Sequence, residues 1–301
     1  MSTLIEICTK NDTNTEEFVS FYDHSNPRSM TNEMPMGFLT PFAYAFLLTI
    51  ELFKLNLMKY AILLCALVCI VACGGKKVKE DHQLLIIKKT TSPPTLDGKA
   101  TENCWNLATW HPLDQNWLGE AYSFQDFNGR YKLSWDDDYL YLLVEITDDT
   151  LYDARKEPLK LWWDDDCVEV FLDEDNSGGL HQFSHNAFAY HIALDGNVVD
   201  LGTDREPRLY NEHIQSARST IGKLTTWEMA IKLYNDQYKD DKVNVPVPLK
   251  QGKKVGFALA YCDNDGSKER ENFIGSVFVP GEDKNQGWIN ADIFGTLLLE
   301  E

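Results

Sequence analysis

Short segments in which apolar and polar residues alternate recur from residue 95 to residue 299, with turn residues between them. Tyr131–Trp135 and Tyr139–Ile146 flank three aspartates, which is the pattern of a β-hairpin. Val168–Leu172 alternates in the same way and runs into the turn-rich residues 173–179. Many short strands at regular spacing predict an all-β chain folded as an antiparallel β-sandwich. The other expected strands are Phe188–Leu194, Val198–Leu201, Trp227–Leu233, Val255–Cys262, Phe273–Val279 and Gly295–Leu299.

Residues 93–301 are expected to form one domain of immunoglobulin or jelly-roll type, because no Pro/Gly/Ser-rich break and no repeat interrupts them. A helix is expected only over Glu102–Trp110. Residues 73–92 start Lys-rich and show no apolar periodicity. We expect them to form a tether, which Pro93-Pro94 closes.

The segment before the tether has the pattern of a secretory signal peptide over residues 58–72, with Met58, one Lys and then an apolar run. Its end, Ile70-Val71-Ala72-Cys73, resembles the bacterial lipobox, so Cys73 is expected to be the lipid anchor. The alternative is a membrane-spanning helix, for which the run is short. Residues 1–57 are expected to be an over-extended gene start. The alternative is that Phe38–Phe53 forms the first half of a membrane hairpin. The chain is then exported and lipid-anchored in the bacterial outer membrane, on either face.

The charge balance excludes one class of partner, because 28 basic residues against 47 acidic residues give a formal net charge of −19. Such a chain repels phosphate backbones and anionic lipid surfaces, so no nucleic acid is expected and membrane contact runs through the lipid anchor only. The seven cysteines are too few and too irregularly spaced for a disulfide scaffold. Cys104, Cys167 and Cys262 are expected to form no obligatory disulfide framework and at most one bridge.

The eight tryptophans divide by their neighbours. Trp163 and Trp288 are flanked by polar residues and are candidates for a sugar-binding platform, since the C–H faces of pyranose rings stack on indole rings. Glu169 and Asn285 are candidates for bonds to the sugar hydroxyls. Alternation along the strand places Glu169 opposite Val168, on the face away from the core; the alternative is a solvated carboxylate. The tryptophans expected in the core are Trp105, Trp110, Trp135 and Trp227.

Other chemistry has weaker support in the sequence. Acidic residues permit a glycosidase, which needs two facing carboxylates, but no motif selects a pair. Residues 173–176, Asp-Glu-Asp-Asn, offer oxygen ligands for calcium, although the spacing of an EF-hand is absent and a solvated turn is the alternative. His181, His185 and His191 lack a zinc-type cluster and are interpreted as surface or strand residues.

At these residues the chain resembles the family 9 carbohydrate-binding modules, which occur on bacterial xylanases and on exported lipoproteins. The resemblance implies a β-sandwich with calcium in some members, a clamp on a terminal sugar by Trp163 and Trp288, and polar contacts from Glu169 and Asn285. This chain has Ser184 at the position after Gln-Phe where family members carry a sugar-binding Arg. The calcium ligands of the family could not be matched to individual residues of this chain. The landmarks, in order, are Leu96-Asp97-Gly98-Lys99, Trp105, Leu133–Tyr141, Trp163–Asp173, Gln182–Asn186, Trp288 and Phe294-Gly295.

The expected function is therefore non-catalytic binding of an oligo- or polysaccharide, of the xylan or cellulose-like glucan class, by a lipid-anchored module. No cofactor other than structural calcium is expected. One alternative is a haem-binding electron-transfer sandwich, which needs an axial ligand such as Met229. The other is a glycoside hydrolase component.

Overall fold

The computed structural model describes residues 4–8, 18–22, 34–35, 53, 59, 79 and 81–301. The chain divides into two compact units, residues 1–76 and residues 77–301. The first unit contains β1 (Leu4–Cys8), β2 (Phe18–Tyr22) and β3 (Met34–Pro35), paired in that order as an antiparallel sheet. Apart from residue 59, the expected signal peptide over residues 58–72 lies outside the described residues, as do Cys73 and most of the expected over-extended start. No helix within the described ranges has the length and apolarity needed to cross a membrane.

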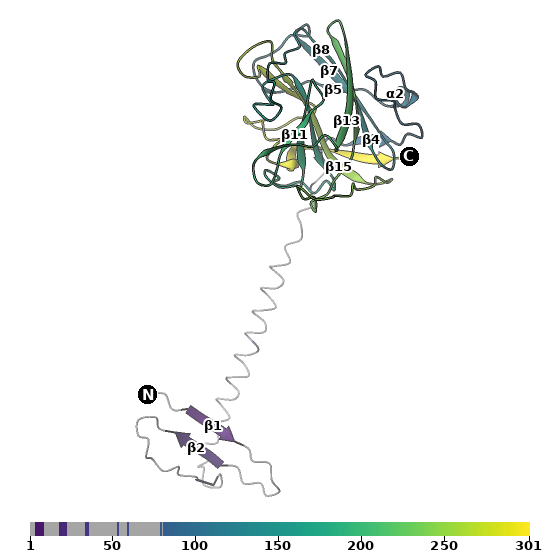
Figure 1. Cartoon of the computed structure of the whole chain (residues 1–301). Helices are drawn as coiled ribbons and strands as arrows, with labels where there is room; N and C mark the ends of the chain where they lie inside the picture. Colours follow the sequence, from purple (N-terminus) through teal and green to yellow (C-terminus); the bar gives the residue numbers. More distant parts are fainter. Residues whose placement is uncertain are drawn as a thin grey trace. The chain divides into compact units, whose positions relative to one another are not determined.

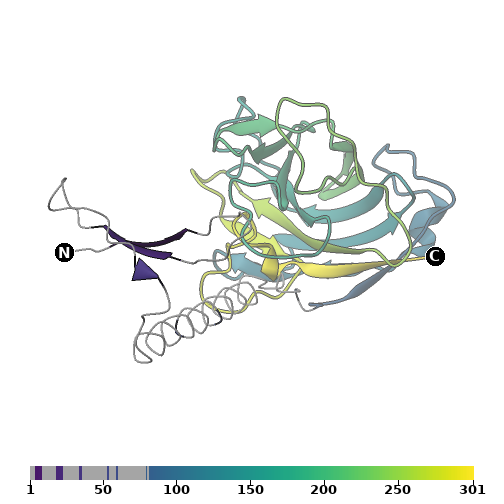
Figure 2. The same cartoon turned by 90° about the horizontal axis from the view of Figure 1, so that it is seen from below.

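The second unit is a sandwich of two sheets, labelled in Figure 1 and seen from below in Figure 2. The five-stranded sheet has the order β13-β14-β8-β7-β5. The nine-stranded sheet has the order β12-β11-β10-β9-β15-β16-β6, and β17 also pairs with both β15 and β4. Every pairing between these strands is antiparallel except that of β17 with β4, which is parallel.

The strands of the five-stranded sheet are β5 (His111–Leu113), β7 (Phe127–Trp135), β8 (Leu140–Asp148), β13 (Ile214–Ile221) and β14 (Leu224–Ile231). Those of the nine-stranded sheet are β4 (Leu85–Lys88), β6 (Gln115–Leu118), β9 (Cys167–Asp173), β10 (Phe188–Ala193), β11 (Val198–Leu201), β12 (Pro207–Leu209), β15 (Lys254–Asp263), β16 (Asn272–Gly275) and β17 (Gly295–Glu300). The helices are α2 (Asn103–Leu107) and the 3₁₀ helix η2 (Ala291–Ile293).

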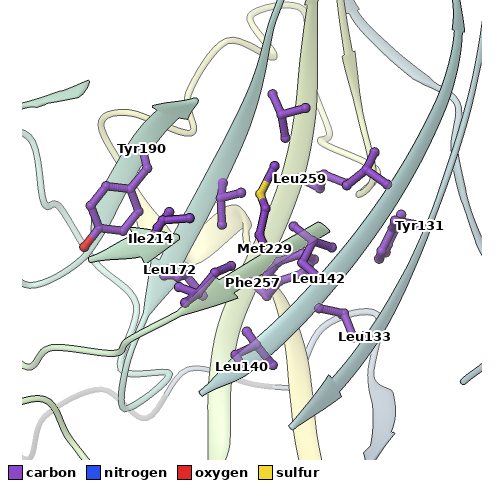
Figure 3. Packing of buried hydrophobic residues seen from close by; sticks show 14 of the residues in the cluster. Tyr131, Leu133, Leu140, Leu142, Leu172, Tyr190, Ile214, Met229, Phe257 and Leu259 are labelled. Carbon is purple, nitrogen blue, oxygen red and sulfur yellow. The ribbon is translucent and has the colours of Figure 1, made fainter. Parts of the chain in front are cut away.

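The main core lies between the two sheets and follows the alternation of the strands. Figure 3 shows Met229 and Leu142 of the five-stranded sheet packed near Leu172, Phe257 and Leu259 of the nine-stranded sheet. All five side chains are at most 3% exposed. The prediction of an antiparallel β-sandwich is therefore confirmed.

The expected β7–β8 hairpin forms, and its turn shows why. The Oδ1 atom of Asp136 accepts hydrogen bonds from the backbone N–H groups of Asp138 and Tyr139, each at 2.9 Å. This side chain satisfies two donors that the turn would otherwise leave without a partner. The three-aspartate pattern was thus a correct signal for a turn.

Three expectations need correction. The tether was expected to extend to residue 92, but Leu85–Lys88 forms β4 and pairs with β17, because its apolar run covers the sheet edge. The helix is shorter than expected and spans Asn103–Leu107. Trp110 was expected in the core but is only half-buried, with the Arg130 guanidinium 4.0 Å from its ring centre. The other three tryptophans expected in the core, Trp105, Trp135 and Trp227, are at most 1% exposed.

Candidate functional site

The face of the nine-stranded sheet that points away from the main core carries the candidate site. On β9, Val168 and Val170 enter the main core, whereas Cys167 and Phe171 belong to a second apolar cluster on the opposite face. Glu169 lies between these two residues and therefore shares their face. The small side chain of Ala189 on this face of β10 leaves room above the sheet.

A cavity of about 330 Å³ occupies this room, which is within the usual size of a small-molecule site. It brings together all five residues predicted to bind sugar: Trp163, Trp288, Glu169, Asn285 and Ser184. The lining residues that the sequence did not single out for sugar binding are Trp162, His181, Phe183, Ala187, Ala189, His191, Asp200, Leu201 and Arg270.

The loop of residues 149–166, between β8 and β9, carries Trp163, which is 37% exposed. Trp162 packs edge-on against it, with ring centroids 4.7 Å apart and an interplanar angle of 81°. Leu161, just before the pair, has a φ of 50°, a left-handed conformation that turns the chain. Carboxylates hold the loop, since Asp165 accepts from the Arg155 backbone N–H at 2.5 Å and Asp166 accepts from that of Tyr152 at 2.7 Å.

Trp288 lies on the loop before η2 and is partly buried against the second apolar cluster. Its neighbour Gly287 lies against Phe171, and a Cβ atom at this position would come within 2.7 Å of the Phe171 ring. His181 Nε2 lies 2.8 Å from the Gly287 carbonyl oxygen, and the His181 N–H donates to the Ile289 carbonyl at 2.9 Å. Burial lowers the pKa of His181 to about 4, so the ring is neutral at pH 7 and donates from Nε2. These contacts hold Trp288 beside the cavity.

Glu169 forms the floor of the cavity and is 2% exposed. Its Oε1 atom pairs with His191 Nε2 and accepts from Arg270 Nη1 at 3.3 Å and from Cys262 Sγ at 3.4 Å. Burial opposes ionisation of this carboxyl, but His191 and Arg270 outweigh it and hold its pKa below the usual range. The alternative of a solvated carboxylate is wrong, because Glu169 is buried and two basic side chains stabilise its charge beneath the cavity.

Arg270 is the main residue that sequence reasoning missed. It comes from the loop between β15 and β16, and its guanidinium lies 4.1 Å from the ring centre of Phe273. Nη1 also donates to Cys262 Sγ at 3.1 Å, whereas no described residue accepts from Nε or Nη2. In the sequence, Arg270 stands in the charged run Lys268-Glu269-Arg270-Glu271, so nothing separated it from surface residues.

The remaining polar groups around the cavity differ in what they can still bind. No described residue bonds the side-chain amide of the half-buried Asn285, whereas the Ser184 hydroxyl donates to the His181 carbonyl at 3.3 Å. Trp162 Nε1 and His191 Nδ1 are buried without a partner among the described residues. Asp200 accepts from the backbone N–H groups of Ala189 and Leu201, and burial raises its pKa to about 8.

Two of the groups of described side chains that resemble metal sites already contact a basic side chain. Glu169, His191 and Cys262 have ligand atoms within 4.8 Å of one another, and the Arg270 guanidinium contacts two of them. In the turn proposed for calcium, Lys79 Nζ donates to Asn176 Oδ1 at 3.2 Å. It also donates to the Phe294 carbonyl at 2.7 Å, so an ammonium group bonds one side chain of this turn.

The family described as "Carbohydrate family 9 binding domain-like" matches residues 96–301. The endo-1,4-beta-xylanase C of Paenibacillus barcinonensis is 26% identical over 223 residues, which are 74% of this chain and 18% of that enzyme. The endo-1,4-beta-xylanase A of Thermoanaerobacterium saccharolyticum is 33% identical over 193 residues, which are 63% of this chain and 16% of that enzyme. The chain therefore spans less than one fifth of the length of these relatives.

Solved structures give the same fold. A family 9 carbohydrate-binding module from Caldicellulosiruptor kristjanssonii in complex with cellotriose is 20% identical, with a TM-score of 0.52, and the match covers 72% of this chain and 93% of the module. The module in complex with glucose gives a TM-score of 0.53 at the same identity. The sandwich is thus shared with these modules.

Proposed function

Because the chain belongs to the carbohydrate family 9 binding domain-like family, we propose that its cavity binds the terminal ring or a short end of a glycan without cleaving it. The observation that carries this proposal is the placement of Trp163 and Trp288 around one cavity whose floor is the Glu169–Arg270 pair. Two indole rings beside charged hydrogen-bonding groups match the two kinds of surface on a pyranose ring.

The floor offers complementary groups to neighbouring hydroxyls. Oε2 of Glu169 receives no hydrogen bond from any described residue and is free to accept from a hydroxyl. Nε and Nη2 of Arg270 are free to donate to a hydroxyl oxygen. The Asn285 amide can do both from the side of the cavity. We propose that Arg270 supplies the guanidinium that family members carry at the position of Ser184.

The ligand class follows from the shape of the aromatic surfaces and from the relatives. Flat indole faces favour sugars whose hydroxyls are equatorial, which is true of both xylan and cellulose-like glucan. Both xylanase relatives carry a segment like this chain, and the solved module was crystallised with cellotriose. We therefore propose xylan or cellulose-like glucan as the partner.

A glycoside hydrolase is the second candidate, and one observation favours it. Asp200 and Glu169 both line the cavity, and their pKa values are displaced in opposite directions. Such a pair is typical of an acid and a nucleophile. However, backbone N–H groups hold both oxygens of Asp200, and Oε1 of Glu169 has three partners. Binding without cleavage fits these contacts better.

Electron transfer through haem has less support. Met229, which was considered as an axial ligand, is 0% exposed and lies between the two sheets (Figure 3). A haem group could reach its sulfur only by disrupting the main core.

Calorimetric titration with xylo- and cello-oligosaccharides tests the proposal, and release of reducing sugar from the same ligands tests the alternative. Saturable binding without release supports a binding module. Release of reducing ends that depends on Glu169 and Asp200 would instead support the hydrolase. The absence of binding to every oligosaccharide would contradict both functions.

We also propose that the domain is exported and lipid-anchored through Cys73, with translation starting at Met58. The support comes from the sequence pattern of residues 58–73, most of which lie outside the described residues. Mass spectrometry of the membrane fraction is expected to find a lipidated peptide that starts at Cys73. Peptides from Asn11–Arg28 would contradict the proposed start, and a Cys73→Ser variant that stays in the membrane fraction would contradict the anchor.

A further inference from the structure

Two segments of the chain together form one wall of the cavity, and we call them the wall segments. The first, residues 176–184, contributes three of the lining residues. The second, residues 285–294, contributes two, of which Trp288 is one. Backbone hydrogen bonds join the segments, and in one of them the Ala291 N–H donates to the Gly179 carbonyl oxygen at 2.8 Å. The position of Trp288 therefore depends on how the two wall segments are held together.

The ammonium group of Lys79 bonds to one residue of each wall segment. Its Nζ atom donates to Asn176 Oδ1 at 3.2 Å, in the first segment, and to the Phe294 carbonyl oxygen at 2.7 Å, in the second. It also lies 5.8 Å from the centre of the Phe294 ring. These partners are 97 and 215 positions away from Lys79 in sequence. Lys79 therefore bridges the wall segments from a third part of the chain.

The turn that receives Lys79 is closely fitted around its aliphatic chain. Gly178 has a φ of 70°, a left-handed conformation that favours glycine. A Cβ atom at this position would lie 3.1 Å from Lys79 Cδ and 2.3 Å from Asp292 Oδ1, which accepts from the Gly179 N–H. A side chain at Gly178 would therefore displace Lys79 or Asp292.

The charge of Lys79 is held in the turn with little to spare. Burial lowers the pKa of its ammonium group to about 8. The carboxylates that oppose this shift belong to Asp173, Asp292 and Asp81. The ammonium is still charged at pH 7, but the charged form is less favourable here than in water. A contact of this kind can respond to a ligand that binds beside it.

Phe294 connects the Lys79 contact to the cavity. Its ring packs against the ring of His181, with centroids 5.6 Å apart and an interplanar angle of 63°. His181 lines the cavity, and its Nε2 donates to the carbonyl oxygen of Gly287, the residue before Trp288. A short series of direct contacts therefore leads from the Lys79 ammonium to the backbone that carries Trp288.

We propose that Lys79 is a positioning residue for the sugar site, and that its ammonium holds the wall segments in the arrangement in which Trp288 stacks on a sugar ring. Bound sugar and docked Lys79 then stabilise the same arrangement, so by linkage each strengthens the other. The coupling to sugar rests on the proposed function, whereas the ordering of the wall segments does not. Lys79 precedes residue 96, where the family match begins, so the region that shapes the site is larger than the matched domain.

Two variants of the purified full chain test the effect on binding. Lys79→Met keeps a long apolar side chain and removes the ammonium. Lys253→Met is the matched control, because Lys253 is also half-buried and pairs with Glu174, which precedes the first wall segment. In calorimetry with xylo- and cello-oligosaccharides, Lys79→Met is expected to weaken binding roughly three- to tenfold. Lys253→Met is expected to lose stability in urea but to keep the wild-type affinity.

Hydrogen exchange without sugar measures the order of the wall segments directly. Peptides from residues 176–184 and 285–294 are expected to exchange faster in Lys79→Met than in the wild type, whereas peptides from β8 serve as the unchanged reference. The wall segments of Lys253→Met are expected to exchange as in the wild type. Equal rates in Lys79→Met and the wild type, or equally fast exchange in both variants, would overturn the proposal.

Lysine acetylation of the wild-type chain measures the coupling in the opposite direction. An amine-reactive ester modifies Lys79 only when its ammonium has left the turn, so the rate reports the undocked state. Saturating oligosaccharide is expected to slow the labelling of Lys79 by about the factor that Lys79→Met loses in affinity. The exposed Lys223 and Lys250 are expected to react at unchanged rates.

The outcomes separate this inference from the proposed function. Equal sugar affinity in Lys79→Met and the wild type would overturn the coupling and leave the proposed function standing. An equal loss of affinity in Lys253→Met, or labelling of Lys79 that bound sugar does not change, would also overturn it. Faster exchange in Lys79→Met together with a wild type that binds no oligosaccharide would instead contradict the proposed function and leave the ordering of the wall segments standing.

Discussion

The carboxylate of Glu169 and the guanidinium of Arg270 meet at the floor of the cavity, with 3.3 Å between Oε1 and Nη1. Glu169 lies in the middle of β9, and Arg270 lies in the loop between β15 and β16. Both side chains are at most 10% exposed. The pair therefore resembles a buried ion pair more than a surface salt bridge, and it can serve both stability and ligand binding.

We expect Arg270→Met to lower the free energy of unfolding by about 3 kcal/mol, because it leaves the Glu169 charge buried with one basic partner fewer. The double variant Glu169→Gln/Arg270→Met is expected to regain most of this stability, since it removes both charges. Neither variant is expected to bind sugar as well as the wild type. Urea unfolding and calorimetry measure the two effects separately.

Arg130→Met is the control for this experiment, because Arg130 pairs with Glu145 at 2.6 Å while 53% of its side chain is exposed. Its loss is expected to cost at most about 1 kcal/mol and to leave sugar binding unchanged. Equal losses of stability in Arg130→Met and Arg270→Met would contradict the buried-pair interpretation.

Trp163→Ala and Trp288→Ala are each expected to weaken oligosaccharide binding about tenfold or more. Stacking of a flat partner on an aromatic ring is worth roughly 1–3 kcal/mol, and a sugar face lies near the low end of this range. Trp163→Ala should leave stability nearly unchanged, whereas Trp288→Ala should also lower it, because Trp288 packs on the second apolar cluster. The half-buried Trp110, which does not line the cavity, gives the control variant Trp110→Ala. Unchanged affinity in both wall variants would place the sugar elsewhere.

His181 predicts a loss of stability in acid. Burial lowers its pKa from 6.5 to about 4, so between these values the unfolded chain binds a proton that the folded chain does not. The stabilisation by neutral His181 is complete above pH 6.5 and is lost progressively as the pH falls to 4, by roughly 3 kcal/mol in total. The His181→Gln variant should show a flatter stability profile across this window. Parallel profiles of variant and wild type would contradict the assignment.

The thiols of Cys104, Cys167 and Cys262 are free, as expected for a chain without a disulfide framework in this domain. Cys167 and Cys262 nevertheless lie opposite each other on β9 and β15. We predict equal unfolding midpoints with and without reductant, because the two apolar clusters stabilise the domain without a covalent link. Alkylation in denaturant should modify all three. A large drop of the midpoint under reduction would show that the opposed pair forms a bridge.

The sequence by itself determined most of the strands and one face of the site. Strands have a period of two, so the apolar alternation of residues 167–173 already placed Glu169 opposite Val168. Polar flanks marked Trp163, Trp288 and Asn285 as residues that do not belong to a core. The apolar run Leu84–Ile87 was an available signal for β4, but a strand at a sheet edge has no turn partner next to it in sequence that would reveal it.

Tertiary structure alone decided which distant groups meet. Arg270, His191 and Glu169 come from separate segments, and the charge of each looks like an ordinary surface charge until the pairing of β9 with β10 and β15 buries them together. Lys79 reaches the acidic turn, and Asp148, Asp166 and Asp263 converge, for the same reason. The local pattern of apolar and polar residues follows the periodicity of the strand backbone, so it can be seen in the sequence. Burial and the influence of neighbouring charges depend on contacts between residues that are far apart in sequence. Only the folded chain sets these contacts.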